Sequence, residues 1–278
     1  MKWMVPKATA LAVVFLLMTG VQTRGEGAPR DRAWEIIRAS AAEKNYEKRA
    51  AAVRVLALLP GETQAQEIAE KAAVDDKPDV RAAAATALGE IQGPSSIEIL
   101  HKLLTDKDPS VVIAAASALH PSKDAGSYEA YYEFLTGERK TGGGMVDTQM
   151  KTFKDPKKLA EFGVEQGMGF VPFAGGAAVT IYTMMRTDDV SPVRAVAAKM
   201  LTNDPDPASG KALLKATTDK SWLVRAAALE AIAKRGDAQL LDSIIPSMKD
   251  ANTAVKCTGA AAVIRLSSIE GKPSPAAK

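Results

Sequence analysis

Few residues in this sequence could do chemistry by their type and spacing. The chain has two histidines, His101 and His120, and one cysteine, Cys257. So small a set excludes most His/Cys metal sites, and a lone cysteine cannot form a disulfide within the chain. The sequence also lacks the Gly-x-Ser-x-Gly turn that presents a nucleophilic serine in many hydrolases. We therefore predict no catalytic residue, no metal ligand and no cofactor.

Many of the acidic and basic residues fall into two columns that recur along the chain. The acidic column holds Glu43, Asp75, Asp106, Asp188, Asp219 and Asp250. Six residues after each acid, the second column holds Arg49, Arg81, Val112, Arg194, Arg225 and Lys256. A catalytic residue is needed once and not six times. The repetition therefore indicates a structural role, also for Asp188, which together with Asp189 would otherwise resemble a pair of catalytic carboxylates.

The columns belong to a sequence repeat of 31 residues, which predicts the elements that position them. Six copies occur. Two of them, segments 78–88 and 109–119, are rich in alanine and begin with a proline. A proline is well tolerated in the first turn of a helix. An amphipathic segment precedes the alanine-rich one, as at 62–74, 95–104 and 239–248, with apolar residues spaced by three or four. Each repeat therefore predicts a pair of helices.

This pattern resembles the short HEAT-like repeats, of about thirty residues, of the phycobilisome-lyase-like group. The resemblance rests on the Asp and Val-Arg-Ala-Ala-Ala columns and covers most of residues 31–123 and 188–270. It implies an all-α, right-handed α-solenoid of about six helical hairpins, whose second helices line one concave face. In this family the charged columns form a ladder between neighbouring repeats. The implied ladder residues here are Asp75, Arg81, Asp106, Asp188, Arg194, Asp219, Arg225, Asp250 and Lys256.

The resemblance does not carry an enzymatic activity to this chain. Some HEAT-like proteins are iron hydroxylases with repeated His-Glu ligands, and others are lyase subunits that attach bilins. Neither His101 nor His120 begins a His-Glu pair, so the hydroxylase activity is not transferred. The repeat alone does not identify the lyase activity.

The repeat is interrupted between Val112 and Arg194. These residues are 82 positions apart, whereas two repeats would need 62. We interpret the excess as an insertion of about 50 residues within one repeat, and assign residues 124–187 to it. Nine of the 14 aromatic residues fall in this region, and aromatic side chains dominate binding interfaces as well as cores. We predict that a protein partner contacts Tyr128, Tyr131, Tyr132, Phe134, Phe170, Phe173 and Tyr182.

Within the insertion, residues 166–185 carry no charge and are numerous enough to span a bilayer. Three interpretations stay open: burial as a long or broken helix against the solenoid, docking on another protein, and insertion into a membrane. The lysines at positions 151, 154, 157 and 158 slightly favour contact with a membrane surface, although such a run also suits a solvated helix face.

The N-terminus has the features of an export signal. Lys2 and Lys7 precede an uncharged stretch that ends at Thr23, with small residues near its end. We assign residues 1–23 to a signal peptide and expect a periplasmic or secreted protein, with an uncleaved signal anchor as the alternative. The polar, proline-bearing tail 271–278 is expected to be disordered.

The charge balance argues against a nucleic-acid partner. Lysine and arginine number 36, aspartate and glutamate 33, and the formal net charge is +3. One column expected on the concave face is mixed and mostly neutral, which suits a protein better than a phosphate backbone. It consists of Arg54, Thr86, Ser117, Lys199, Glu230 and Ala261.

Together these observations predict an exported, non-catalytic scaffold or adaptor for protein–protein interaction that uses the concave face and the insertion. One alternative is a membrane-associated protein held by residues 166–185. The other is an enzyme or lyase-type subunit with a pocket at the insertion. The sequence identifies neither the protein partner nor the oligomeric state.

Overall fold

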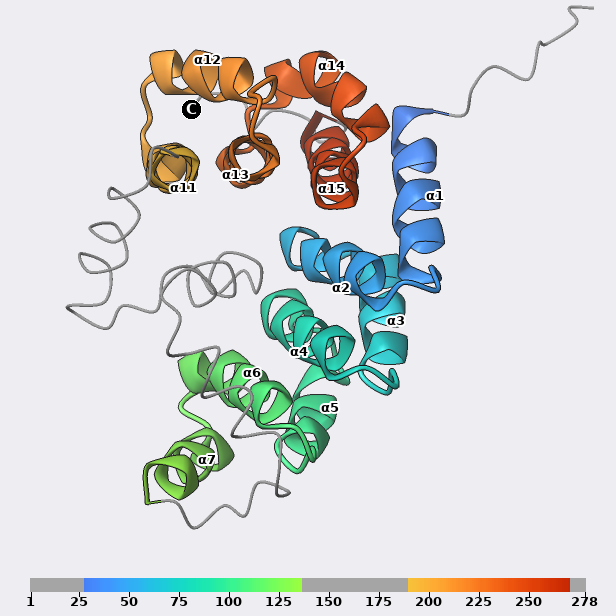
Figure 1. Ribbon diagram of the computed structural model, residues 1–278, viewed down its shortest axis with the longest axis vertical. Coiled ribbons are helices and arrows are strands. Elements are labelled where there is room, and N and C mark those ends of the chain that lie inside the picture. Colours follow the sequence, from blue (N-terminus) through green and yellow to red (C-terminus); the bar gives the residue numbers. More distant parts are fainter. Residues whose placement is uncertain (1–27, 137–189, 271–278) are drawn as a thin grey trace, which may run out of the picture.

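The computed structural model describes residues 28–136 and 190–270, and every regular element in these ranges is a helix (Figure 1). The N-terminal block contains α1 (Pro29–Ala41), α2 (Tyr46–Arg54), α3 (Thr63–Ala72), α4 (Pro78–Ile91), α5 (Ser96–Leu103), α6 (Pro109–Leu119) and α7 (Ala125–Thr136). The C-terminal block contains α11 (Ser191–Met200), α12 (Pro207–Ala216), α13 (Trp222–Arg235), α14 (Leu241–Ile244) and α15 (Thr253–Glu270). Short 3-10 turns are η1 (Val55–Leu58), η2 (His120–Ser122), η3 (Leu201–Asn203), η4 (Ala238–Leu240) and η5 (Ile245–Lys249).

The helices pair into hairpins that stack into an α-solenoid, which confirms the predicted fold class. In Figure 1 the second helices of the pairs, such as α4 and α13, lie along the inner side of the arc, and first helices such as α3 and α12 lie outside. Alanine suits this stacking, because its small side chain lets helices approach closely and its helix propensity is high. The buried alanines of α4 are Ala82, Ala83, Ala84, Ala85 and Ala87.

Helices α4 and α6 approach closely at Gly89. A Cβ atom at this residue would lie 2.6 Å from the Cβ and 3.0 Å from the Cα of Ala118. Alanine usually stabilises a helix relative to glycine, but Gly89→Ala forces these two helices apart. We expect this substitution to lower the free energy of unfolding by about 1–3 kcal/mol, measured by urea denaturation.

Gly126→Ala is the matched control for Gly89→Ala, because Gly126 also lies within a helix. A Cβ atom at Gly126 would meet Leu104 Cδ1 at 2.8 Å, at the movable end of a side chain rather than at a backbone atom. A loss of stability that is no larger at Gly89 than at Gly126 would contradict this account of the helix packing.

The two blocks meet through helix α15, which packs against α1 and α2 of the N-terminal block and against α13 of its own block (Figure 1). Most side chains of α15 are buried, so it joins the cores of both blocks. The second helices therefore follow one another along the stack in the order α11, α13, α15, α2, α4 and α6, so the N-terminal block continues the stack from the C-terminal end of the chain. An insertion within one repeat would place α7 beside α11, whereas the structure places these two helices at opposite ends of the stack (Figure 1).

Helix α7 belongs to the stack, although it lies within residues 124–187, which the sequence assigns to the insertion. It packs on α6 in the way that the first helix of a further pair would. Val112, which replaces the basic residue in the third copy of the column, is buried there together with Ala116 and Ala130. The described part of the N-terminal block thus continues to Thr136.

Several predictions concern residues outside the described ranges. These are the signal peptide at 1–23, the uncharged segment 166–185, the tail 271–278, and the candidate residues Phe170, Phe173, Tyr182 and Asp188. Among the residues that the structure does describe, no helix is both long enough and apolar enough to cross a membrane.

Candidate protein-binding surface

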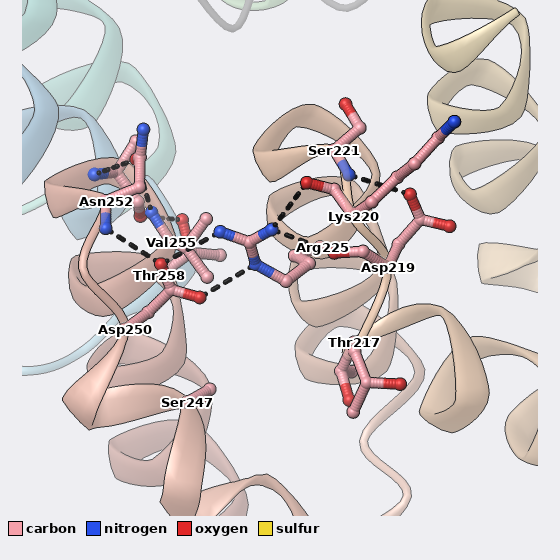
Figure 2. A network of polar contacts seen from close by, with 12 residues as sticks. Thr217, Asp219, Lys220, Ser221, Arg225, Ser247, Asp250, Asn252, Val255 and Thr258 are labelled. Carbon is pink, nitrogen blue, oxygen red and sulfur yellow. Dashed lines mark hydrogen bonds and ion pairs between the residues drawn. The ribbon is translucent and has the colours of Figure 1, made fainter.

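The charged columns pair between neighbouring repeats. Arg81 of α4 donates hydrogen bonds from Nε and Nη2 to the Asp106 carboxylate, at 2.7 and 2.9 Å. Arg225 of α13 binds Asp250 in the same bidentate way, at 2.7 and 3.0 Å (Figure 2). The corresponding pairs elsewhere in the stack are Arg49 with Asp75 and Arg194 with Asp219. The structure therefore uses these side chains to link consecutive repeats.

The same residues also hold the turns between helices. Arg225 Nη1 donates to the Asp219 carbonyl at 2.8 Å, which ties the start of α13 to the turn before it (Figure 2). Asp250 Oδ1 accepts the Asn252 N–H at 2.8 Å and so closes the turn before α15. This arrangement recurs around Arg81 in the N-terminal block. Both the turn geometry and the contact between repeats thus depend on one pair of side chains.

The ladder makes stability depend on pH. Burial alone would raise the pKa of Asp106, but hydrogen bonds from Arg81 and the Asp108 N–H outweigh it and lower the pKa. Burial would also raise the pKa of Asp250, but hydrogen bonds from Arg225 and the Asn252 N–H lower it. Such carboxylates stabilise the fold above their unfolded pKa of about 4, and this stability is lost as the pH falls through the folded pKa. We predict that the free energy of unfolding, measured by urea denaturation, falls as the pH is lowered, and that this fall is less steep in Asp106→Asn than in the unchanged protein. An equally steep fall in Asp106→Asn would contradict the stabilising role of the Asp106 carboxylate.

A different polar cluster joins the two blocks at the junction between α15 and α1. Lys256, the ladder position of α15, takes part in none of the ion pairs between described residues. Instead, Arg30 at the start of α1 donates to both Glu62 carboxylate oxygens, at 2.8 and 2.7 Å, and to the Ile264 carbonyl at 2.7 Å. Arg265 donates to a carbonyl of η1 at 2.8 Å. The sequence does not predict this cluster, because Arg30 and Glu62 belong to no repeated column.

The aromatic candidates of α7 divide into a packed pair and an exposed pair. Tyr131 and Phe134 pack against the small core between α6 and α7. Tyr128 and Tyr132 are 50% and 59% exposed. Leu135, which is not among the predicted contact residues, is 87% exposed. Spacings of four and three residues place these three side chains on one side of the helix. We call Tyr128, Tyr132 and Leu135 the α7 face.

The α7 face is apolar and has an acidic edge. The His120 ring lies edge-on to Tyr128 and Tyr131, with ring centroids 5.4 and 5.9 Å apart. Helix α7 contains Glu129 and Glu133 and neither lysine nor arginine. Electrostatic complementarity therefore favours a partner that combines apolar and basic residues.

The column expected on the inner side of the arc forms no basic stripe. Ala261 is buried, and Lys199 pairs with Glu230 across neighbouring second helices at 3.3 Å. Burial alone would raise the pKa of Glu230, but Lys199 and Lys234 lower it and keep the carboxylate ionised at neutral pH. This mixed surface does not resemble a phosphate-binding groove.

The groups with the chemistry of catalysis or metal binding are dispersed. No three His, Cys, Asp or Glu side chains lie together as metal ligands would within residues 28–136 and 190–270. Cys257 is buried in α15, and burial raises the pKa of its thiol, which disfavours the nucleophilic thiolate. The α7 face is therefore the surface feature of the described chain that most clearly suggests binding.

Comparison with known proteins identifies the family. A family model for HEAT repeats matches residues 35–120 and 180–265, which together make up more than half of the chain. The chain belongs to the HEAT-repeat family. No curated protein matches this HEAT-repeat chain.

Three solved structures are similar to this HEAT-repeat protein over most of its length. Human deoxyhypusine hydroxylase in complex with glycerol is 15% identical, with coverage of 86% of this chain and 97% of that chain and a TM-score of 0.33. The complex of CpcE and CpcF of phycocyanin lyase from Nostoc sp. PCC7120 is 19% identical, with coverage of 87% and 98% and a TM-score of 0.32. An engineered protein is 17% identical, with coverage of 85% and 97% and a TM-score of 0.28. The activities in these names are those of the other proteins.

Proposed function

We propose that this HEAT-repeat protein is a non-catalytic interaction scaffold that binds a protein partner through the α7 face. The observation that supports this function is the row of three large exposed side chains, Tyr128, Tyr132 and Leu135, at one end of the stack of described helices. A terminal repeat of a solenoid normally presents a polar outer surface, which keeps the protein soluble. Tyrosine is also enriched among the residues that carry most of the binding energy at protein interfaces.

The repeats hold the α7 face in place before any partner binds. Ser117 Oγ and Tyr131 Oη share a hydrogen bond of 3.1 Å between α6 and α7. His101 of α5 bonds to Asp124, directly before α7, at 2.9 Å. Burial alone would raise the pKa of Asp124, but the bonds from His101 and the Gly126 N–H lower it. A surface fixed in this way loses little conformational entropy on binding.

A photoreactive phenylalanine analogue in place of Tyr132 tests the proposed function in the native cells. Irradiation should give an adduct with a protein that mass spectrometry identifies. The same analogue at Ile97 is the matched control, because Ile97 lies on α5 and is also 59% exposed. With the analogue kept at position 132, the added changes Tyr128→Ser/Leu135→Ser should abolish capture of the protein while thermal unfolding is unchanged. Equal capture at both sites, or none at Tyr132, would overturn the proposal.

We further propose that the protein acts outside the cytoplasm after removal of residues 1–23. The support is the basic, then apolar, then small-residue pattern of this segment. Cell fractionation with an alkaline carbonate wash, followed by N-terminal sequencing, should give a soluble protein that starts near Arg24. Retention in the membrane with Met1 still present would identify a signal anchor instead. Retention after removal of the signal would point to residues 166–185 as a membrane element.

A further inference from the structure

In the N-terminal block, one position in two successive first helices makes a polar contact with the residue directly before the following first helix. Glu70 of α3 accepts a hydrogen bond from Ser95, directly before α5. His101 of α5, 31 residues later, bonds to Asp124, directly before α7, at 2.9 Å. Tyr132 of α7 holds the same position another 31 residues on. Its side chain, which is 59% exposed, is therefore placed to bond through its hydroxyl to the residue that precedes a further first helix.

Leu135 holds a second position of this kind. Leu104, 31 residues earlier, lies against the first turn of α7, where a Cβ atom at Gly126 would be 2.8 Å from Leu104 Cδ1. Leu104 is half-buried, whereas Leu135 is 87% exposed. The α7 face thus has the register of a surface on which another helix stacks, with a small residue in the first turn of that helix.

The opposite end of the stack carries a helix with the required features. Asp206 directly precedes α12 and caps it, since its carboxylate accepts the Ala208 N–H at 2.8 Å. Asp206 therefore corresponds to Asp124, and the exposed Ala208 corresponds to Gly126. Helix α11, the neighbouring second helix, adds the exposed side chain of Met200 to this end.

The two ends of the stack are also complementary in charge. Helix α7 contains Glu129 and Glu133 and no base, whereas α12 contains Lys211 and Lys215 and no acid. Both lysines are exposed and lie one turn apart. Opposite charges favour contact between α7 and α12, and like charges disfavour contact of either helix with its own copy.

We infer that α7 of one molecule stacks against α12 of a second copy of this chain. The inference rests on the proposed function, because it names the occupant of the same face. In the contact, Tyr132 Oη donates to the Asp206 carboxylate of the second copy, and Leu135 covers its Ala208. The contact joins two different surfaces, so it is heterologous and extends the solenoid into a longer chain or a closed ring of molecules.

Two variants of the full chain, each with one added cysteine, test the contact directly. Leu135→Cys mixed with Ala208→Cys should form a disulfide-linked dimer on mild oxidation, because only contact between molecules can join these cysteines. The native Cys257 is buried and does not compete. Ile97→Cys mixed with Ala208→Cys is the matched control. A yield of dimer no higher than in this control would overturn the inference.

Sedimentation equilibrium of the unmodified chain gives a second, independent measurement. We expect the average mass to rise with concentration beyond that of a dimer, and Lys211→Glu/Lys215→Glu to weaken association by about tenfold or more. Glu129→Lys added to this variant should restore part of the association. A monomer at every concentration would overturn the inference, and capture of another protein at Tyr132 would then leave the proposed function standing. An internal disulfide in the Leu135→Cys/Ala208→Cys double variant would also overturn it.

Discussion

Replacement of Arg81 by methionine is expected to lower the free energy of unfolding by about 3–5 kcal/mol, a large part of the stability of a typical domain. The side chains of Arg81 and Asp106 are only 8% and 11% exposed, and two hydrogen bonds join them. Methionine keeps much of the aliphatic volume but leaves the Asp106 carboxylate buried without its counter-ion. The Asp75 carbonyl loses its hydrogen bond as well. Urea denaturation at neutral pH measures the change.

Lys48→Met is the control, because the side chains of Lys48 and its partner Glu43 are both 47% exposed. Exposed ion pairs contribute about 0–1 kcal/mol, so a much smaller loss is expected there. Asp106→Leu added to Arg81→Met should recover much of the stability, since it removes the uncompensated buried charge. Equal losses for Arg81→Met and Lys48→Met would show that burial does not govern the strength of these ion pairs.

Ile264→Ala in α15 is expected to cost about 2–5 kcal/mol and to loosen both blocks at once. The Ile264 side chain is fully buried, and α15 packs against α13 on one side and against α1 on the other. A cavity in α15 therefore removes contacts from the core that the two blocks share. Hydrogen exchange should become faster in α1 and α2 as well as in α13.

Ile269→Ala is the control for this second prediction. Ile269 lies in the same helix and is 38% exposed, so we expect a loss below about 1 kcal/mol. If Ile264→Ala accelerates exchange only within the C-terminal block, α15 does not couple the two blocks and the account of the junction is wrong.

The α7 face shows how far the sequence leads toward the candidate site. The clustering of aromatic residues directed attention to α7, but Tyr131 and Tyr132 are neighbours in sequence and differ in environment. Adjacent residues of a helix point about 100° apart, so the docking of α7 on α6 decides which one packs and which one stays exposed. The sequence does not predict that Leu135 belongs to this face, because a single leucine in an apolar region can be buried or exposed and only the structure shows which.

The sequence by itself determined the helix pairs, the solenoid and the positions of the ladder pairs. A period of 31 or 32 residues within each block gives consecutive repeats matching contacts, so Arg81 and Arg225 each bind the aspartate of the following repeat. Val112 and Lys256, the two positions of the second column without arginine, come last in their blocks, which is a signal that the ladder changes there.

Only the tertiary structure decided which of the described helices lie next to each other where the two blocks meet. Arg30 and the Ile264 carbonyl that it binds are 234 positions apart, and no periodicity relates them. Their contact depends on the shapes of α1 and α15 and on the apolar surface that these helices bury together. A repeat pattern specifies how one unit contacts the next, but it does not specify which unit lies beside the last one. That choice was made by the packing of side chains that are distant in sequence.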